Sequence, residues 1–272
     1  MSGMTAQTRL FGVFGDPVYH SLSPCMQNAA FQATGMNAVY LAFHVTDLEK
    51  AVAGIRGLNV QGVSVTIPHK SDVMGYLDAI DPKAAAIGAV NTIVNHHGWL
   101  TGYNTDCEGA IHALSAQCVI KGRRVVMAGA GGAAKAIGFG VIKAGGQLTV
   151  CSHLPDEAVV LAGVLGCGSA HLDAAPDLPM DIFINATPLG MVPDILTTPL
   201  PGEALKPGMT VMDCVYHPLE TRLLREAAAA GCQCIDGTAM FVHQGAAQFR
   251  LWTGVDAPAD VMRAAVKDAL TG

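Results

Sequence analysis

One short segment restricts the possible folds of this chain more than any other. Residues 125–128 are all apolar, and the sequence Gly-Ala-Gly-Gly-Ala-Ala follows at 129–134. A strand that runs through such a loop into a helix is typical of a βαβ dinucleotide-binding unit, because the glycines permit a tight turn and let the backbone approach a pyrophosphate. Unpaired N–H groups at the start of the helix then face the phosphates. A glycine-rich turn without a ligand is the alternative, which the strand and helix on either side disfavour.

The chain after this loop continues in the order of a Rossmann domain. We expect the helix to end near Ala144, with later strands at 148–152, 182–185 and 209–215. These elements predict a Rossmann-like NAD(P)-binding domain over residues 108–237.

The choice between the two nicotinamide cofactors is normally made at the end of the second strand. An acid there binds the ribose of NAD, or an arginine meets the 2′-phosphate of NADP. This chain has Cys151-Ser152-His153 instead, and Asp156 or Glu157 would serve only if the loop curled back. The residues therefore leave the choice open.

The first hundred residues predict a separate α/β domain with a mixed sheet. Strands and helices alternate before a hairpin turns at His96-His97-Gly98. We assign residues 1–107 to this domain, completed by helical residues 238–272. The expected strands are 9–15, 39–45, 63–67, 91–94 and 99–103, and the expected helices are 23–33 and 47–56.

Composition excludes several classes of protein. A length of 272 residues fits two domains, and 14% charged against 51% hydrophobic residues excludes a disordered chain. A net charge of −6 without a basic run argues against nucleic acid as a partner. No segment has the length of a membrane helix or the pattern of a signal peptide, so we expect a cytoplasmic protein. The eight cysteines have neither metal-site nor disulfide spacing, so we expect buried apolar thiols and no metal.

Three features of the first domain suggest chemistry, although each has a simple structural explanation. Ser21 and Ser23 follow a strand and suit a polar substrate, but Ser23-Pro24 also reads as an N-cap with a first-turn proline. Lys70 lies between a strand and a helix, where a lysine can transfer protons. Asp106 reads as the N-cap of a helix from Cys107, yet an aspartate near a lysine would orient it.

The motifs together resemble those of the shikimate dehydrogenase family, including its shikimate/quinate relatives, over essentially the full length. The matching stretches, in order, are Gly15-Asp16-Pro17-Val18, His20-Ser21-Leu22-Ser23-Pro24, Val65-Thr66-Ile67-Pro68-His69-Lys70, Gly88-Ala89-Val90-Asn91-Thr92, Gly102-Tyr103-Asn104-Thr105-Asp106, Gly129-Ala130-Gly131-Gly132-Ala133, Asn185-Ala186-Thr187-Pro188-Leu189-Gly190-Met191, Asp213-Cys214-Val215-Tyr216-His217-Pro218 and Gly237-Thr238-Ala239-Met240 through Gln244 to Gly254.

The resemblance implies an oxidoreductase that interconverts shikimate and 3-dehydroshikimate with NADP in aromatic amino-acid biosynthesis. It implies that Lys70 accepts the proton and that Asp106 is its partner. By the same resemblance the substrate contacts are Ser21, Ser23, Thr66, Asn91, Tyr216 and Gln244, and the cofactor contacts are Gly129, Ala130, Gly131, Gly132, Ala133, Ser152, His153, Thr187, Val215, Gly237 and Met240.

Three departures from the family pattern modify these expectations. Ser64 replaces an asparagine, Gly245 replaces an alanine, and Cys151-Ser152-His153 replaces Asn-Arg-Thr. Without the arginine we expect a weaker preference for NADP, with NAD as the alternative cofactor. A quinate or shikimate-like polyol dehydrogenase, or a ligand-sensing relative without catalysis, stays open as an alternative. The family implies a monomer or a homodimer.

Overall fold

The computed structural model, described for residues 4–271, divides into two compact units. The first consists of Met1–Thr105 with Gln244–Gly272, and the second of Asp106–His243. The sequence-based division placed its boundaries after residue 107 and before residue 238, within one helix of these positions. Each unit is a sheet covered by helices, so the predicted two-domain α/β fold is confirmed.

The first unit contains the mixed sheet that its alternating elements predict. The strand order is β2-β1-β3-β5-β6-β4, with β1 parallel to β2 and β3 and with β5 antiparallel to both of its neighbours. A two-residue turn at His97 and Gly98 joins β5 to β6, and both residues have positive φ values. The strands are β1 (Arg9–Gly15), β2 (Ala38–His44), β3 (Gly62–Val65), β4 (Ala79–Ile80), β5 (Thr92–His96) and β6 (Trp99–Tyr103).

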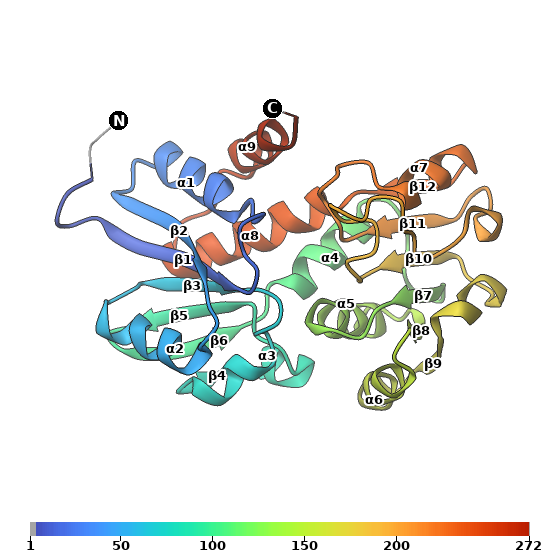
Figure 1. Ribbon diagram of the computed structural model, residues 1–272, viewed down its shortest axis with the longest axis horizontal. Coiled ribbons are helices and arrows are strands. Elements are labelled where there is room, and N and C mark those ends of the chain that lie inside the picture. Colours follow the sequence, from blue (N-terminus) through green and yellow to red (C-terminus); the bar gives the residue numbers. More distant parts are fainter. Residues whose placement is uncertain (1–3, 272) are drawn as a thin grey trace. The chain divides into compact units, whose positions relative to one another are not determined.

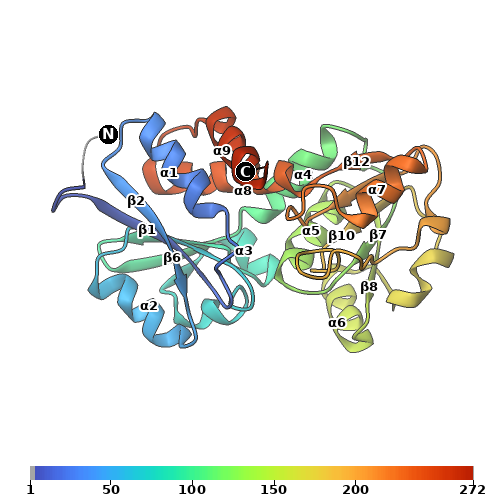
Figure 2. The same ribbon diagram turned by 45° about the horizontal axis from the view of Figure 1, so that its top comes forward.

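Helices cover both faces of this sheet. On one face α2 contributes buried Val52 and Ile55 to an aliphatic core. On the other face an aromatic cluster joins the N-terminal part of this unit to its C-terminal part. The ring centroid of Phe31 lies 5.0 Å from that of Phe11 and 5.4 Å from that of Phe249. Figure 2 shows α9 beside α1. The helices of this unit are α1 (Ser23–Ala33), α2 (Leu48–Gly57), α3 (Pro82–Ile87), the end of α8 (Gly237–Thr253) and α9 (Ala259–Thr271), with a 3-10 turn, η1 (Asp72–Tyr76).

The second unit is a parallel sheet in the order of a Rossmann domain. Its strands lie in the order β12-β11-β10-β7-β8-β9, so the order reverses between β7 and β10, where such sheets bind ligands. Apolar cores fill both faces, as expected for strands with few polar residues. The strands are β7 (Arg124–Ala128), β8 (Gln147–Ser152), β9 (Gly168–His171), β10 (Ile182–Asn185), β11 (Thr210–Asp213) and β12 (Gln233–Ile235).

Helices and 3-10 turns alternate with the strands along the second unit, as Figure 1 shows. Helix α5 begins at Gly132, inside the glycine loop, and α4 packs against it. Within residues 4–271 no helix has the length and apolar character needed to cross a membrane. The elements are α4 (Asp106–Ser115), α5 (Gly132–Lys143), α6 (Pro155–Leu165), α7 (Arg222–Ala229) and the start of α8, with 3-10 turns η2 (Leu172–Asp177) and η3 (Gly202–Ala204).

Three local predictions were wrong. The strand expected to reach residue 67 ends at Val65, because the chain turns before Pro68. The helical segment at the C-terminus is two helices, separated at Gly254, which has positive φ. The cysteines were expected to be buried, but only Cys107 and Cys151 are; Cys234 is exposed on β12, which lies at the edge of its sheet.

Candidate active site

Lys70 lies in the turn that follows β3. Val90 N donates to the Lys70 carbonyl at 2.7 Å, and Thr66 N donates to the carbonyl of Phe14 at 2.9 Å. The neighbouring His69 is buried, and its Nε2 donates to the Val45 carbonyl at 2.9 Å. These bonds hold the backbone on both sides of the lysine.

Asn91 is the hub of the polar side chains in the first unit. It is 2% exposed, and its Nδ2 lies 2.9 Å from Thr105 Oγ1 and 3.4 Å from Gln244 Oε1. Its Oδ1 accepts from Thr105 N at 2.8 Å. Val65 N donates to the Asn91 carbonyl at 2.8 Å, which places the end of β3 and Thr66 next to it. The structure thus places the side chain of Gln244, and the backbone that leads to Thr66, next to Asn91.

A second set of buried polar side chains leads from Asn91 towards Ser23. Gln248 Nε2 donates to the Asn91 carbonyl at 3.2 Å, Ser64 donates to Gln248 Oε1 at 2.7 Å, and Tyr40 donates to Ser64 at 2.6 Å. Tyr40 also has a side-chain hydrogen bond with Ser23, and burial raises the pKa of its phenol. We call Tyr40, Ser64 and Gln248 the polar relay.

The polar relay has a fixed direction. A backbone carbonyl only accepts hydrogen bonds, so the amide of Gln248 must turn its nitrogen towards Asn91 and its oxygen towards Ser64. Ser64 must then donate to Gln248 and accept from Tyr40. One main-chain oxygen therefore determines the orientation of three hydrogen-bonding groups in the first unit.

Two capping predictions were wrong. Ser23 is the first residue of α1 and not its N-cap; Leu22 occupies the cap position without a side-chain hydrogen bond. The Ser23 side chain instead bonds Tyr40, while Ser21 Oγ accepts from Ser23 N at 3.3 Å. Asp106 was expected before the helix and is instead the first residue of α4, where it is 4% exposed. Capping therefore does not account for Ser23.

In the second unit the glycine loop lies against the end of β10. A Cβ on Gly129, whose φ is +112°, would lie 2.7 Å from the Ala186 carbonyl and 3.2 Å from Thr187 Cγ2. Only glycine tolerates this approach and this backbone conformation. A Cβ on Gly131 would meet no atom within 4 Å, so the N-terminus of α5 is open there. This cradle fits the pyrophosphate of a dinucleotide.

An asparagine and an aspartate hold the loops on the β10 side of the switch point. Asn185 Oδ1 accepts from Thr187 Oγ1 at 2.6 Å, and its Nδ2 donates to Asp213 Oδ1 at 2.9 Å. Asp213 also accepts from Val215 N at 2.9 Å and from Thr221 Oγ1 at 2.7 Å. Two of the expected cofactor residues, Thr187 and Val215, are thus positioned by one buried pair.

Asp213 makes the stability of the protein depend on pH. Burial raises its pKa to about 6, against the opposing effect of its three hydrogen-bond donors. A raised carboxyl pKa stabilises the folded state below about pH 4, and this contribution is lost as the pH rises through 6. Relative to Asp213→Asn, we expect wild-type protein to gain about 2 kcal/mol between pH 7 and pH 4. Urea unfolding of both proteins measures this difference, and a pH-independent difference would contradict it.

The remaining expected cofactor residues lie near the carboxyl ends of the strands of the same sheet. Gly129 N donates to the Cys151 carbonyl at 2.7 Å, so Ser152 and His153 follow directly beside the loop. Gly237 packs against Val215, because a Cβ on it would lie 2.6 Å from the Val215 carbonyl. Met240 is buried in the core that also holds Ala130 and Ala133. Tyr216, an expected substrate contact, lies in this unit and stacks on Phe241 with ring centroids 4.6 Å apart.

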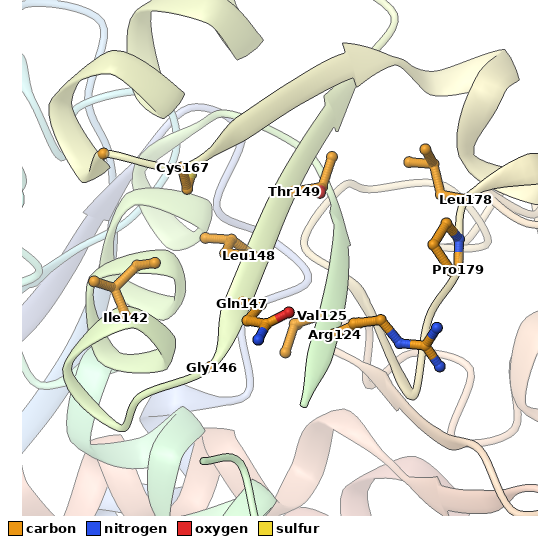
Figure 3. Close-up of a pocket in the computed structure, with 11 residues that line it drawn as sticks. Arg124, Val125, Ile142, Gly146, Gln147, Leu148, Thr149, Cys167, Leu178 and Pro179 are labelled. Carbon is orange, nitrogen blue, oxygen red and sulfur yellow. The ribbon is translucent and has the colours of Figure 1, made fainter. Parts of the chain in front are cut away.

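A cavity of about 400 Å³ lies at the opposite end of the strands, where β7 and β8 begin. Figure 3 shows Arg124 and Gln147, the first residues of β7 and β8, on its lining. Arg124 bonds Asp181 at 2.7 Å. Because dinucleotides bind at the carboxyl ends of such strands, this cavity is not the cofactor site.

Known proteins are similar to this chain both in two separate segments and along nearly its whole length. Residues 13–93 match the family described as the shikimate dehydrogenase substrate binding domain, and residues 237–267 match the shikimate 5'-dehydrogenase C-terminal domain. A shikimate dehydrogenase (NADP(+)) of Moorella thermoacetica is 45% identical over 285 residues, which cover 99% of this chain and 96% of the relative. The chain belongs to the shikimate dehydrogenase family.

Solved structures of the shikimate dehydrogenase family share the fold as well. One, in complex with NADP+, is 41% identical with a TM-score of 0.95 and covers 100% of this chain and 99% of its own. That of Thermus thermophilus, in complex with NADP(H) and shikimate, is 37% identical with a TM-score of 0.89, covering 97% and 100%. The resemblance inferred from sequence motifs is confirmed.

Sequence reasoning missed several residues that this shikimate dehydrogenase fold places beside the expected site. Gln248 lies one helical turn after Gln244, a spacing that marks one helix face. Asn185 and Asp213 begin motifs that were recognised, but no role was given to them. Tyr40 carries no signal in the sequence, since an aromatic residue in a strand usually belongs to the core.

Proposed function

We propose that this protein catalyses the reversible oxidation of shikimate to 3-dehydroshikimate with a nicotinamide cofactor, as a step of aromatic amino-acid biosynthesis. The observation that carries the proposal is the similarity to shikimate dehydrogenases along 99% of the chain. The hydrogen-bonded arrangement of Asn91, Gln244 and Thr105 supports it, because it offers amide and hydroxyl groups to a polyol acid.

The first unit supplies the substrate contacts. Hydroxyl groups of Ser21 and Ser23 suit the carboxylate, while Thr66, Asn91 and Gln244 suit the ring hydroxyls. The family resemblance makes Tyr216 a further substrate contact, and its ring stacks on Phe241. Uncharged donors and acceptors of this kind orient a hydroxylated ring without selecting a highly charged ligand.

Lys70 and Asp106 perform the proton transfer. Oxidation of a secondary alcohol releases a proton from oxygen and a hydride from carbon. Lys70 Nζ accepts the hydroxyl proton and returns it in the reverse direction, and the Asp106 carboxylate orients the hydroxyl and the amine. A nicotinamide bound at the glycine loop would supply the hydride acceptor. The loop Gly129 to Ala133 holds the pyrophosphate, with Thr187, Val215, Gly237 and Met240 forming the surface for the rest of the cofactor.

The test is the change in absorbance at 340 nm with purified protein and either shikimate or quinate, each paired with NADP or NAD. We expect the largest kcat/KM with shikimate. A larger kcat/KM with quinate would reassign the protein to the polyol dehydrogenase alternative. Absence of turnover in all four pairs would contradict the proposal and leave a ligand-binding role.

A further inference from the structure

The turn after β8 lies where a Rossmann domain binds the adenosine ribose of a dinucleotide. Gly129 N bonds the Cys151 carbonyl, so the phosphate loop and the end of β8 are in direct contact. On its other side Ser152 pairs with His171, the last residue of β9. Ser152 Oγ accepts from Leu154 N at 3.1 Å, which closes a tight turn into α6. A 2′-phosphate on a ribose at this edge would meet these residues.

The charge of this region does not suit a phosphate. From Ala144 to Leu205 the sequence contains no lysine or arginine, although it contains seven aspartate and glutamate residues. Two of these, Asp156 and Glu157, are exposed in the first turn of α6. A 2′-phosphate placed at the turn would therefore face carboxylates and no permanent cation.

The two histidines at the turn do not replace an arginine. His171 Nδ1 accepts from Asp173 N at 3.2 Å, and the Asp173 carboxylate lies 3.4 Å from the same nitrogen. A phosphate at His171 would therefore meet a carboxylate beside the ring. His153 is exposed, and an imidazole cannot form the two parallel hydrogen bonds of a guanidinium.

Lys135 is the cation nearest in sequence to the glycine loop. It lies in the first turn of α5 after the glycine loop. A charge at that position acts on the pyrophosphate, which NAD and NADP have in common. Lys135 therefore strengthens the binding of both cofactors and does not distinguish them.

We infer that the turn from Ser152 to Glu157 is not a 2′-phosphate site and that this protein binds NADP with less than a tenfold advantage over NAD. The inference rests on the proposed function in that a nicotinamide cofactor binds the glycine loop. An arginine–phosphate contact contributes about 10- to 100-fold in affinity, and this chain offers none at the turn.

The first experiment measures binding without turnover. Calorimetry compares adenosine 2′,5′-diphosphate with AMP, and fluorescence titration compares NADPH with NADH. We expect the ligands of each pair to bind within tenfold of one another. A preference of tenfold or more for the 2′-phosphate would overturn the inference while leaving the proposed function intact. Failure of both dinucleotides to bind would instead overturn the proposed function.

The second experiment installs the missing cation. In His153→Arg, at an exposed position, we expect the preference for adenosine 2′,5′-diphosphate over AMP to rise by tenfold or more. Val164→Arg is the matched control, because it adds a positive charge to the exposed last turn of α6, at the other end of the helix from the turn at His153. An equal rise in both variants would overturn the assignment, since it would show a general effect of charge.

Discussion

Replacing Lys70 with alanine is expected to lower kcat for shikimate oxidation by about 10²- to 10⁴-fold, the usual contribution of a positioned general base. The affinity for the nicotinamide cofactor should stay nearly unchanged, because Lys70 is not part of the glycine loop that would hold the pyrophosphate. Steady-state kinetics and fluorescence titration of the cofactor measure the two effects separately.

A lysine on the surface of the same unit provides the control for this experiment. Lys50 is 86% exposed and pairs with Asp47 at 2.8 Å in the first turn of α2. Lys50→Ala removes the same positive charge and should leave kcat unchanged. If Lys70→Ala weakened cofactor binding and left kcat nearly intact, Lys70 would not be the proton acceptor.

Gly131→Ala is expected to weaken cofactor binding by about tenfold or more while leaving the fold unchanged. The backbone of Gly131 has φ −73° and ψ −171°, which alanine adopts without strain. The added Cβ would meet no protein atom within 4 Å, so the free protein has room for it. That room is where the backbone must approach the pyrophosphate, and a methyl group there displaces a charge-assisted hydrogen bond.

Gly163→Ala, in the exposed interior of α6, is the matched control. Its Cβ also meets nothing within 4 Å, and alanine in a helix should stabilise the protein by about 0.5–1 kcal/mol. Cofactor affinity should not change in this variant. Thermal unfolding and cofactor titration of both variants separate stability from binding. An unchanged affinity in Gly131→Ala would show that the pyrophosphate does not lie against this residue.

Most of the fold could be predicted because its signals are local. From Val125 onward an apolar strand, a glycine-rich turn and a helix follow one another directly in the sequence. In the structure this strand, β7, lies at the point where the strand order of the sheet reverses. The hairpin at His97 and Gly98 is equally local. The positions of helix ends were less predictable, as Ser23 and Asp106 show, because a side chain that suits a cap can also bond a distant residue.

The candidate site could be predicted only in part. Motif order indicated Asn91 and Gln244, and the structure brings their side chains to 3.4 Å. The polar relay of Tyr40, Ser64 and Gln248 was not predictable, because its members are joined across 24 and 184 positions of the chain. Hydrogen bonds between such distant residues leave no periodic pattern in the sequence.

The polar relay also limits how this protein can change during evolution. Ser64 is 5% exposed and Gln248 is 2% exposed, and each completes the hydrogen bonding of the other. A mutation of either residue alone to an apolar one leaves a buried polar group without its partner, which costs about 1–3 kcal/mol. In lineages where Ser64 is exchanged for the asparagine of the family pattern, residue 248 should therefore change in the same step or soon after. The two positions should be inherited as a pair.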